Sequence, residues 1–433
     1  MKSLLRSLVL SVCIGVVSAV AAQAQVIDRT LLGQSAQKLT IAIGGFAPFT
    51  LGSEDLGKLG ASVLNADLKF TTVFDVMEGS ILPFDPTTVQ LDQEKMTFPG
   101  LAGLKVQFLA VAQVSSRGKE AVLEGRLFDV TGGREVFRKR YIGDPKYYRL
   151  IVHRYADDIL FNITGEKGVA QTRIAYVSAV SRTAKEIYVM DYDGANPIML
   201  TGNQSINVSP RWSPDGRVLA YTSYRNNNPD LMVLNFDSGR RDVLSSQRGL
   251  NITPAWSPDG QWVVLAMSVG TGTNLFLMPK GGGTPKPLTT GPAISVSPSF
   301  SPNGRQIAFN SDRGGTPQIY VMDADGANLR RLTFQGTYNS SPRWSSRGDK
   351  IVFMCRLGGN QICLINPDGS DLRQLTSAGA NEDPAWSPDG RHIVFSSTRA
   401  GSRSLFVMHA DGSEQRRLTP NGETYLPDWS PAP

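Results

Sequence analysis

Acidic residues in short turns are the first candidates for chemistry in this chain. Asp191-Tyr-Asp-Gly194 and Asp323-Ala-Asp-Gly326 have the alternating acids with which a calcium-binding loop begins. Such a loop also needs a later bidentate acid, which neither segment supplies. Asp-Gly is also a favoured turn of β-hairpins. We therefore interpret both segments as turns between strands, and the sequence predicts no metal and no cofactor.

The sequence carries no recognisable catalytic motif. It lacks a Gly-x-Ser-x-Gly nucleophile elbow, a His-Glu-x-x-His pair, a phosphate-binding glycine loop and metal-spaced cysteines. We interpret His153, in a predicted helix, as a surface or packing residue, and His392 and His409, in predicted strands, as packing residues. These features favour a binding protein over an enzyme.

The elements that position every other residue are built on a recurring turn. Its aromatic first residue recurs at steps of 44, 44, 44, 42 and 43 residues. A repeat of roughly 40–45 residues is typical of β-propellers. In the Ser-Pro-Asp-Gly core, proline presets one turn dihedral and glycine accepts the positive φ that follows. The copies begin at Trp212, Trp256, Phe300, Trp344, Trp386 and Trp429.

The phase of the repeats predicts how the ring closes. Each repeat has an inner strand before the turn and an unbroken apolar strand after it. The first apolar strand, near residue 174, has no inner strand before it, and the last inner strand has no strand after it. Pairing residues 425–430 with 174–178 supplies the missing inner strand of the first blade and removes two exposed strand edges. We predict an N-terminal α/β domain followed by a six-bladed β-propeller closed by the C-terminal strand.

Residues 1–24 predict an export signal. Lys2 and Arg6 precede an apolar run over residues 8–20, and Ala22-Gln23-Ala24 forms a cleavage site. We then predict a flexible mature N-terminus over 25–36, the α/β domain over 37–165, a linker over 166–171 and the propeller over 172–433. The net charge of +6 falls to +4 on cleavage, and no basic stripe with aromatic residues predicts nucleic-acid binding.

Two cysteines of the mature chain flank a predicted hairpin turn. Cys355 and Cys363 enclose Leu357-Gly358-Gly359-Asn360. An odd-length loop centred on Gly359 would place the two cysteines opposite each other, within disulfide reach. A two-residue turn would instead pair Cys355 with Ile362, and two buried thiols would remain. The sequence leaves both arrangements open.

The mouth of the propeller channel is the predicted binding site. Residues just before each inner-strand proline are expected to project there, as a ring of short polar side chains with one acidic pair. Such a ring suits hydrogen bonds to a partner loop or peptide. The predicted residues are Asn207, Asn251, Thr253, Ser295, Ser297, Asn339, Ser341, Asn381, Glu382, Asp383 and Tyr425.

The combination of these features resembles the TolB family. A signal peptide, an α/β domain, the junction Thr172-Arg-Ile-Ala-Tyr-Val177, Asp191-Tyr-Asp-Gly194 and repeated Trp-Ser-Pro-Asp-Gly occur together over the whole mature chain. The resemblance implies a non-enzymatic, monomeric periplasmic adaptor of the Tol–Pal system, at most peripheral to the membrane. Its implied partners are the lipoprotein Pal, TolA and bacteriocin translocation segments. Its implied roles are outer-membrane integrity and constriction during cell division.

The resemblance also implies where the partners bind. Pal would contact Leu250, Asn251, Thr253, Val296 and their equivalents at the propeller mouth. TolA would contact the mature N-terminus, at Gln25, Val26, Ile27 and Asp28. The chain shares Val26-Ile-Asp28 with the family's terminal segment and departs from it beyond that point.

Two alternative functions use similar repeats. A propeller can regulate a serine peptidase, but this requires a hydrolase domain of about 200 residues, which we do not expect in this chain. A propeller enzyme can hold a metal in its channel, but the predicted mouth lacks the required histidine and carboxylate set.

Overall fold

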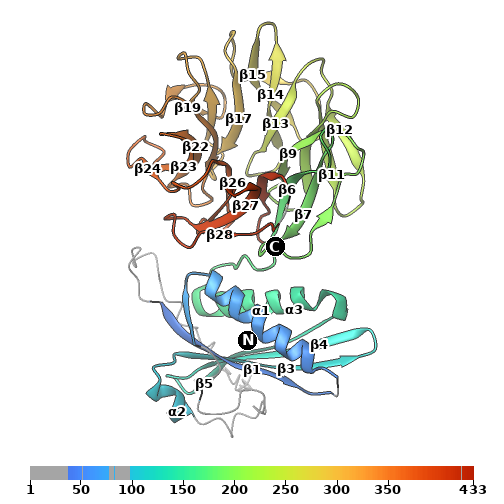
Figure 1. The fold of residues 1–433 in the computed structure, drawn as a ribbon, viewed down its shortest axis with the longest axis vertical. Coiled ribbons are helices and arrows are strands. Elements are labelled where there is room, and N and C mark those ends of the chain that lie inside the picture. The colour runs from blue at the N-terminus through green and yellow to red at the C-terminus, as the bar shows by residue number, and fades with distance from the viewer. Residues whose placement is uncertain (1–37, 51, 78–81, 83–97, 421) are drawn as a thin grey trace, which may run out of the picture.

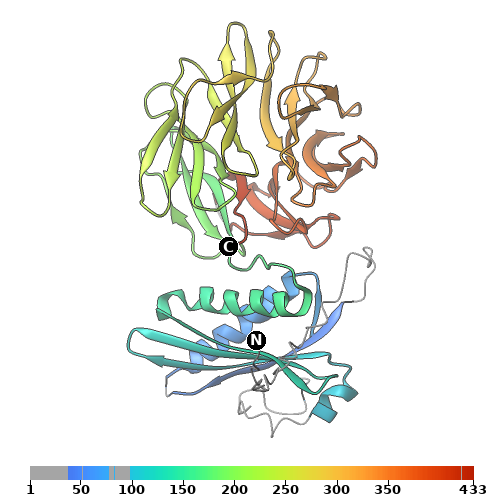
Figure 2. The ribbon, with the colours of Figure 1, turned by 180° about the vertical axis from the view of Figure 1, so that it is seen from behind.

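The computed structural model describes residues 38–50, 52–77, 82, 98–420 and 422–433. The predicted export signal and mature N-terminus lie outside these residues. The chain forms an α/β domain and a propeller, and the α/β domain lies beside the first and last blades (Figures 1 and 2). Among the described helices, none has the length and apolarity needed to cross a bilayer.

The described residues of the N-terminal domain form a five-stranded sheet in the order β2-β1-β3-β4-β5. β1 pairs in parallel with β2 and β3, and the remaining pairs are antiparallel. Helices α1 and α3 cover one face, between the sheet and the propeller (Figure 1). The elements are β1 (Leu39–Pro48), α1 (Glu54–Phe70), β2 (Phe74–Met77), α2 (Phe98–Gly103), β3 (Phe108–Arg117), β4 (Glu120–Asp129), β5 (Arg134–Gly143), a 3-10 turn (Pro145–Tyr147) and α3 (Tyr148–Thr164).

The propeller has six four-stranded sheets, as predicted. Blade 1 is β29-β6-β7-β8, and blades 2 to 6 take their strands in chain order. The strands of blades 1 to 3 are β6 (Arg173–Ala179), β7 (Lys185–Asp191), β8 (Ile198–Met199), β9 (Asn207–Trp212), β10 (Val218–Ser223), β11 (Asp230–Asn235), β12 (Arg241–Ser245), β13 (Asn251–Trp256), β14 (Trp262–Val269), β15 (Gly272–Pro279) and β16 (Lys286–Pro287).

The remaining blades repeat this plan. The second strand of each blade is buried on both faces, because it packs against the neighbouring blades. The strands are β17 (Ser295–Phe300), β18 (Gln306–Ser311), β19 (Gln318–Asp323), β20 (Arg330–Arg331), β21 (Asn339–Trp344), β22 (Ile351–Arg356), β23 (Asn360–Ile365), β24 (Arg373–Gln374), β25 (Asn381–Trp386), β26 (His392–Ala400), β27 (Ser402–His409), β28 (Arg416–Arg417) and β29 (Thr424–Trp429).

The predicted ring closure is confirmed. β29 pairs antiparallel with β6, with Tyr425 opposite Val177 and Trp429 opposite Ile174. The indole N–H of Trp429 donates a hydrogen bond to the Thr172 hydroxyl at 2.8 Å, so the two ends of the propeller are joined by side chains as well.

The repeated turn has the predicted chemistry. In the first copy the Ser213 hydroxyl donates to Asp215 at 2.5 Å and accepts from the Val218 backbone N–H at 2.9 Å. Gly216 adopts a φ of 68°, which favours glycine. In blades 2 to 6 the turn joins the inner strand to the second strand, whereas in blade 1 these strands come from the two ends of the propeller.

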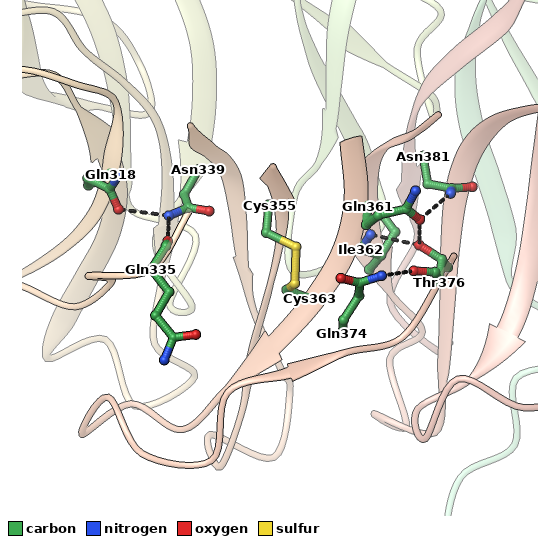
Figure 3. The surroundings of a disulfide bond; sticks show 10 residues. All are labelled: Gln318, Gln335, Asn339, Cys355, Gln361, Ile362, Cys363, Gln374, Thr376 and Asn381. Carbon is green, nitrogen blue, oxygen red and sulfur yellow. Dashed lines mark hydrogen bonds between the residues drawn. A yellow bond between two sulfur atoms is a disulfide. The ribbon is translucent and has the colours of Figure 1, made fainter. Parts of the chain in front are cut away.

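Cys355 and Cys363 form a disulfide, shown in Figure 3. Neither predicted register occurs, because Arg356 pairs with Asn360 across a three-residue loop. Cys355 lies opposite Gln361, and Cys363 is its diagonal neighbour with a Cα–Cα distance of 5.8 Å. This distance is within the normal disulfide range, so the alternative of two buried thiols is wrong.

The contact between the domains is aromatic and charged. The Phe70 ring at the end of α1 stacks on His392 of blade 6, with centroids 3.8 Å apart. His153 is buried and lies 2.7 Å from the Asp67 carboxylate, which also accepts a hydrogen bond from the Tyr192 hydroxyl. Burial disfavours the charged imidazolium, but the Asp67 carboxylate outweighs this effect and raises the pKa of His153. His153 is therefore a packing residue, one of the two roles that the sequence left open.

Candidate functional site

The third residue of every inner strand has an unusual backbone conformation. Each strand bulges at this position, where a residue with positive φ directly precedes a proline. This conformation is disfavoured for non-glycine residues and for residues before proline. Backbone strain of this kind is often found at functional sites. The six residues are Ser209, Thr253, Ser297, Ser341, Asp383 and Leu426, with φ between 48° and 56°.

These third residues border the channel. The Thr253 hydroxyl accepts a hydrogen bond from the Ser297 backbone N–H at 3.1 Å, across neighbouring inner strands. The Asp383 carboxylate accepts from the Leu426 N–H at 3.4 Å in the same way. All except Ser209 are partly exposed. We use the term mouth for the channel end at which the inner strands begin.

The prediction that the first residue of each inner strand projects into the mouth is wrong. Asn207, Asn251, Ser295, Asn339 and Asn381 are fully buried. Their side chains are used in hydrogen bonds within the propeller.

Asn339 and Asn381 show what these first residues do. The Asn339 amide donates to Gln318 of the preceding blade at 2.7 Å, and the Asn381 amide donates to Gln361 at 2.8 Å (Figure 3). The bulge at the third residue breaks the strand's alternation, so the first and third side chains do not share a face. The four asparagines therefore join neighbouring blades, whereas Ser295 bonds to Ser311 within its own blade. None of the five is exposed for a partner.

One side of the mouth is charged and aromatic. The Glu382 carboxylate lies 3.0 Å from the Arg403 guanidinium and accepts a hydrogen bond from the Asn360 amide at 2.6 Å. Arg403 and Lys185 both lie over the Tyr425 ring, at 5.8 and 5.4 Å from its centroid. We call these five residues the charged sector. Its groups come from blades 5, 6 and 1.

The opposite side of the mouth is apolar. Leu250, Ile252 and Val296 are half-buried, and the Ile294 side chain is 50% exposed. They lie at the start of blades 3 and 4, and we call them the apolar sector. A partner that inserts apolar groups here and charged groups at the charged sector would match both sides.

Sequence reasoning missed three residues of the charged sector. Asn360 and Arg403 lie at or near hairpins between the second and third strands of their blades, and Lys185 begins a third strand. Those hairpins lie at the same channel end as the connections into the inner strands, because the strands are antiparallel. This strand order was available from the repeats and could have indicated the three positions.

Asp383 lies directly after Glu382 and is the second acid of the mouth. Burial, and secondly the Glu382 carboxylate, raise the pKa of Asp383 above its ordinary value. Within the described ranges of the chain, no group of three or more histidine, cysteine or acidic side chains could hold a metal ion. The predicted TolA contacts, residues 25–28, lie outside the described residues.

The fold and site define a class of protein: a β-propeller with an N-terminal α/β domain and a sectored channel mouth. Residues 161–433 match the model of the TolB β-propeller domain, and residues 30–136 match that of the TolB amino-terminal domain. The chain belongs to the TolB family.

Curated relatives match over part of their length. A Tol-Pal system protein TolB from Desulfosudis oleivorans is 36% identical over 197 residues, 45% of this chain and 44% of that protein. The TolB protein from Geobacter sulfurreducens is 42% identical over 194 residues, 44% of each chain. The matches therefore span less than half of these relatives.

A solved structure supports the fold along most of the chain. The crystal structure of TolB from Acinetobacter baumannii covers 92% of this chain, and 97% of that chain is matched, with a TM-score of 0.77. The identity is 24%, so this likeness concerns the fold alone.

Proposed function

We propose that this protein is a non-enzymatic periplasmic adaptor of a Tol–Pal system. In this proposal the propeller mouth binds the lipoprotein Pal, and the mature N-terminus at residues 25–28 binds TolA. The protein thereby supports outer-membrane integrity and constriction during division, and bacteriocins can use the same surfaces. Support comes from membership of the TolB family and from relatives named as Tol-Pal system proteins.

The observation that carries the Pal proposal is the division of the mouth into two sectors on a rigid ring. The apolar sector offers Leu250 and Val296, and the charged sector offers Glu382, Arg403 and Tyr425. Buried apolar and aromatic anchors surrounded by polar contacts are typical of protein-binding surfaces. Because the six strands are fixed by the closed ring, a partner finds the surface already formed, which reduces the entropic cost of binding.

The predicted contact residues have different roles in this proposal. At the bulges, polar groups come from Thr253, Ser297 and Ser341. Two further contacts, Glu382 and Tyr425, belong to the charged sector. The buried residues Asn207, Asn251, Ser295, Asn339 and Asn381 act indirectly, since they hold the inner strands in place. We propose them as supporting residues rather than contacts.

Calorimetric titration of the full chain with Pal from the same bacterium tests the proposal. Val296→Asp places a charge in the apolar sector, and Glu382→Arg reverses the charge beside Arg403. Each should weaken Pal binding at least about ten-fold, because hot-spot substitutions cost 2 kcal/mol or more. Arg240→Gln is the matched control, since the Arg240 side chain is 75% exposed on the rim of blade 2. The proposal fails if Pal does not bind, or if both mouth variants bind as tightly as the control.

A further inference from the structure

A cavity lies at the end of the channel opposite the mouth, where the repeated turns meet. It has a volume of about 400 Å³. We call it the turn-end cavity. Its rim carries turn prolines from several blades, of which Pro214, Pro258 and Pro302 are exposed. Its wall holds the aromatic residue of all six repeats, namely Trp212, Trp256, Phe300, Trp344, Trp386 and Trp429.

Two arginines lie among the residues that line this apolar cup. Arg211 and Arg343 occupy the same position in their inner strands, directly before the aromatic residue, and come from blades 2 and 5. Blades three positions apart in a six-bladed ring face each other across the channel. The two guanidinium groups therefore approach the same central space from opposite walls.

A single carboxylate is the ion-pair partner of both arginines. Oδ1 of Asp428 lies 3.8 Å from Arg211 and 3.3 Å from Arg343. Its Oδ2 accepts a hydrogen bond from the Trp212 backbone N–H at 2.8 Å. Among the described residues, no other carboxylate forms an ion pair with either arginine. One carboxylate therefore faces two guanidinium groups, which leaves one positive charge without a close counter-ion.

Two buried donors beside the cavity lack acceptors within the described part of the chain. Nε of Arg211 has no hydrogen-bond partner there, although nine-tenths of the residue is buried. The indole N–H of Trp212 is also without one. By contrast, four other indoles have acceptors. Those of Trp256, Trp344 and Trp386 donate to backbone carbonyl oxygens, and that of Trp429 donates to the Thr172 hydroxyl. Buried donors are normally satisfied, so this wall of the cavity is suited to a ligand that brings an acceptor.

We infer that the turn-end cavity binds a carboxylate carried on an apolar or aromatic body, with Arg211 and Arg343 as its anchors. A monoanion matches the one unbalanced charge, whereas a phosphate dianion would exceed it. Guanidinium groups suit the planar carboxylate, and the ring of aromatic side chains and prolines suits the apolar body. The carboxylate can belong to a free small molecule or to the C-terminus of a peptide.

The test compares acids with their neutral amides on the unchanged full-length protein. Phenylacetate and phenylacetamide are titrated by calorimetry, followed by the peptide Ala-Ala-Phe with a free or an amidated C-terminus. At least one acid should bind more tightly than its amide by a factor of about ten or more, because the amide loses a charge-assisted hydrogen bond. Whichever acid binds identifies the source of the carboxylate. The inference is overturned if neither acid binds, or if acid and amide bind equally.

A variant then locates the site. Arg343→Gln should reduce the affinity for the bound acid about ten-fold or more and leave the weak binding of the amide unchanged. Arg240→Gln, on the rim of blade 2, is the control and should bind like the unchanged protein. Equal acid binding by both variants would place the site elsewhere and overturn the inference. If Arg343→Gln does not fold, the comparison of acid with amide on the unchanged protein still tests the inference.

Discussion

The carboxylate of Asp428, on the last strand, accepts a hydrogen bond from the backbone N–H of Trp212 at 2.8 Å. Asp428 belongs to β29 of blade 1, whereas Trp212 ends β9 of blade 2. The same carboxylate approaches Arg211 and Arg343. One side chain thus links the closing strand to the next blade and is the shared ion-pair partner of two guanidinium groups.

Asp428→Ala should destabilise the propeller strongly. Removal of one partner from a buried ion pair leaves uncompensated charge and typically costs about 3–5 kcal/mol. The free energy of unfolding, measured in urea, should fall by this amount. Asp237→Ala is the control, because the Asp237 side chain is 67% exposed and lies 4.0 Å from Arg217. A loss below about 1 kcal/mol for Asp428→Ala would contradict the role assigned to this carboxylate.

Deletion of residues 424–433 should abolish cooperative unfolding of the propeller. The deletion removes β29, so β6 becomes an exposed edge and the ring opens. Differential scanning calorimetry should then show loss of the propeller transition. A truncated chain that melts like the intact protein would show that β29 does not hold the ring closed.

Much of the fold follows from local chemistry that the sequence displays. Pro214 and Gly216 define a turn type by themselves, and its repetition sets the phase of six blades. The phase in turn requires β29 to pair with β6, as the structure confirms. The register of the hairpin between Cys355 and Cys363 was harder to predict. One loop residue more or fewer changes the register, and the repeat does not determine the loop length.

The site was less predictable because a bulge changes which side chains face the channel. Asn251 and Thr253 are two residues apart, and a regular strand would place both on one face. The bulge at Thr253 breaks this alternation, and Asn251 is buried instead. Arg403 reaches Glu382 from another strand, a contact that depends on the three-dimensional arrangement rather than on any motif.

Removal of the disulfide should lower stability modestly. The bond joins residues eight apart in sequence, and closure of so short a loop is worth up to about 2.5 kcal/mol. The double variant Cys355→Ser with Cys363→Ser should therefore lose up to that amount of unfolding free energy. The unchanged protein should show the same loss after reduction. If reduction has no effect on the midpoint, the disulfide does not contribute to stability.

His392 should make the protein less stable in mild acid. Burial, and secondly His409, lower the pKa of His392 from 6.5 to about 3. As the pH falls below about 6.5 the unfolded chain binds a proton that the folded chain rejects. Stability should decrease by at most about 1.4 kcal/mol for each pH unit between these values.

The matched variant is His392→Phe, which keeps an aromatic ring against Phe70 and does not titrate. The difference in unfolding free energy between the variant and the unchanged protein should grow from pH 7 to pH 4. Other titrating groups, including His153 with its raised pKa, contribute to both proteins and cancel in the difference. Parallel profiles of unfolding free energy against pH would contradict the lowered pKa of His392.

Hydrogen exchange of the full chain with and without Pal tests most directly where the partner binds. Pal binding at the mouth should slow exchange in the residues that form it, which are 249–254, 294–298, 381–383 and 424–426. The turns at 214–217 and 258–261, at the opposite end of the channel, should show no change. Protection confined to those turns, or no protection anywhere in the propeller, would contradict the proposal that the mouth is the Pal-binding surface.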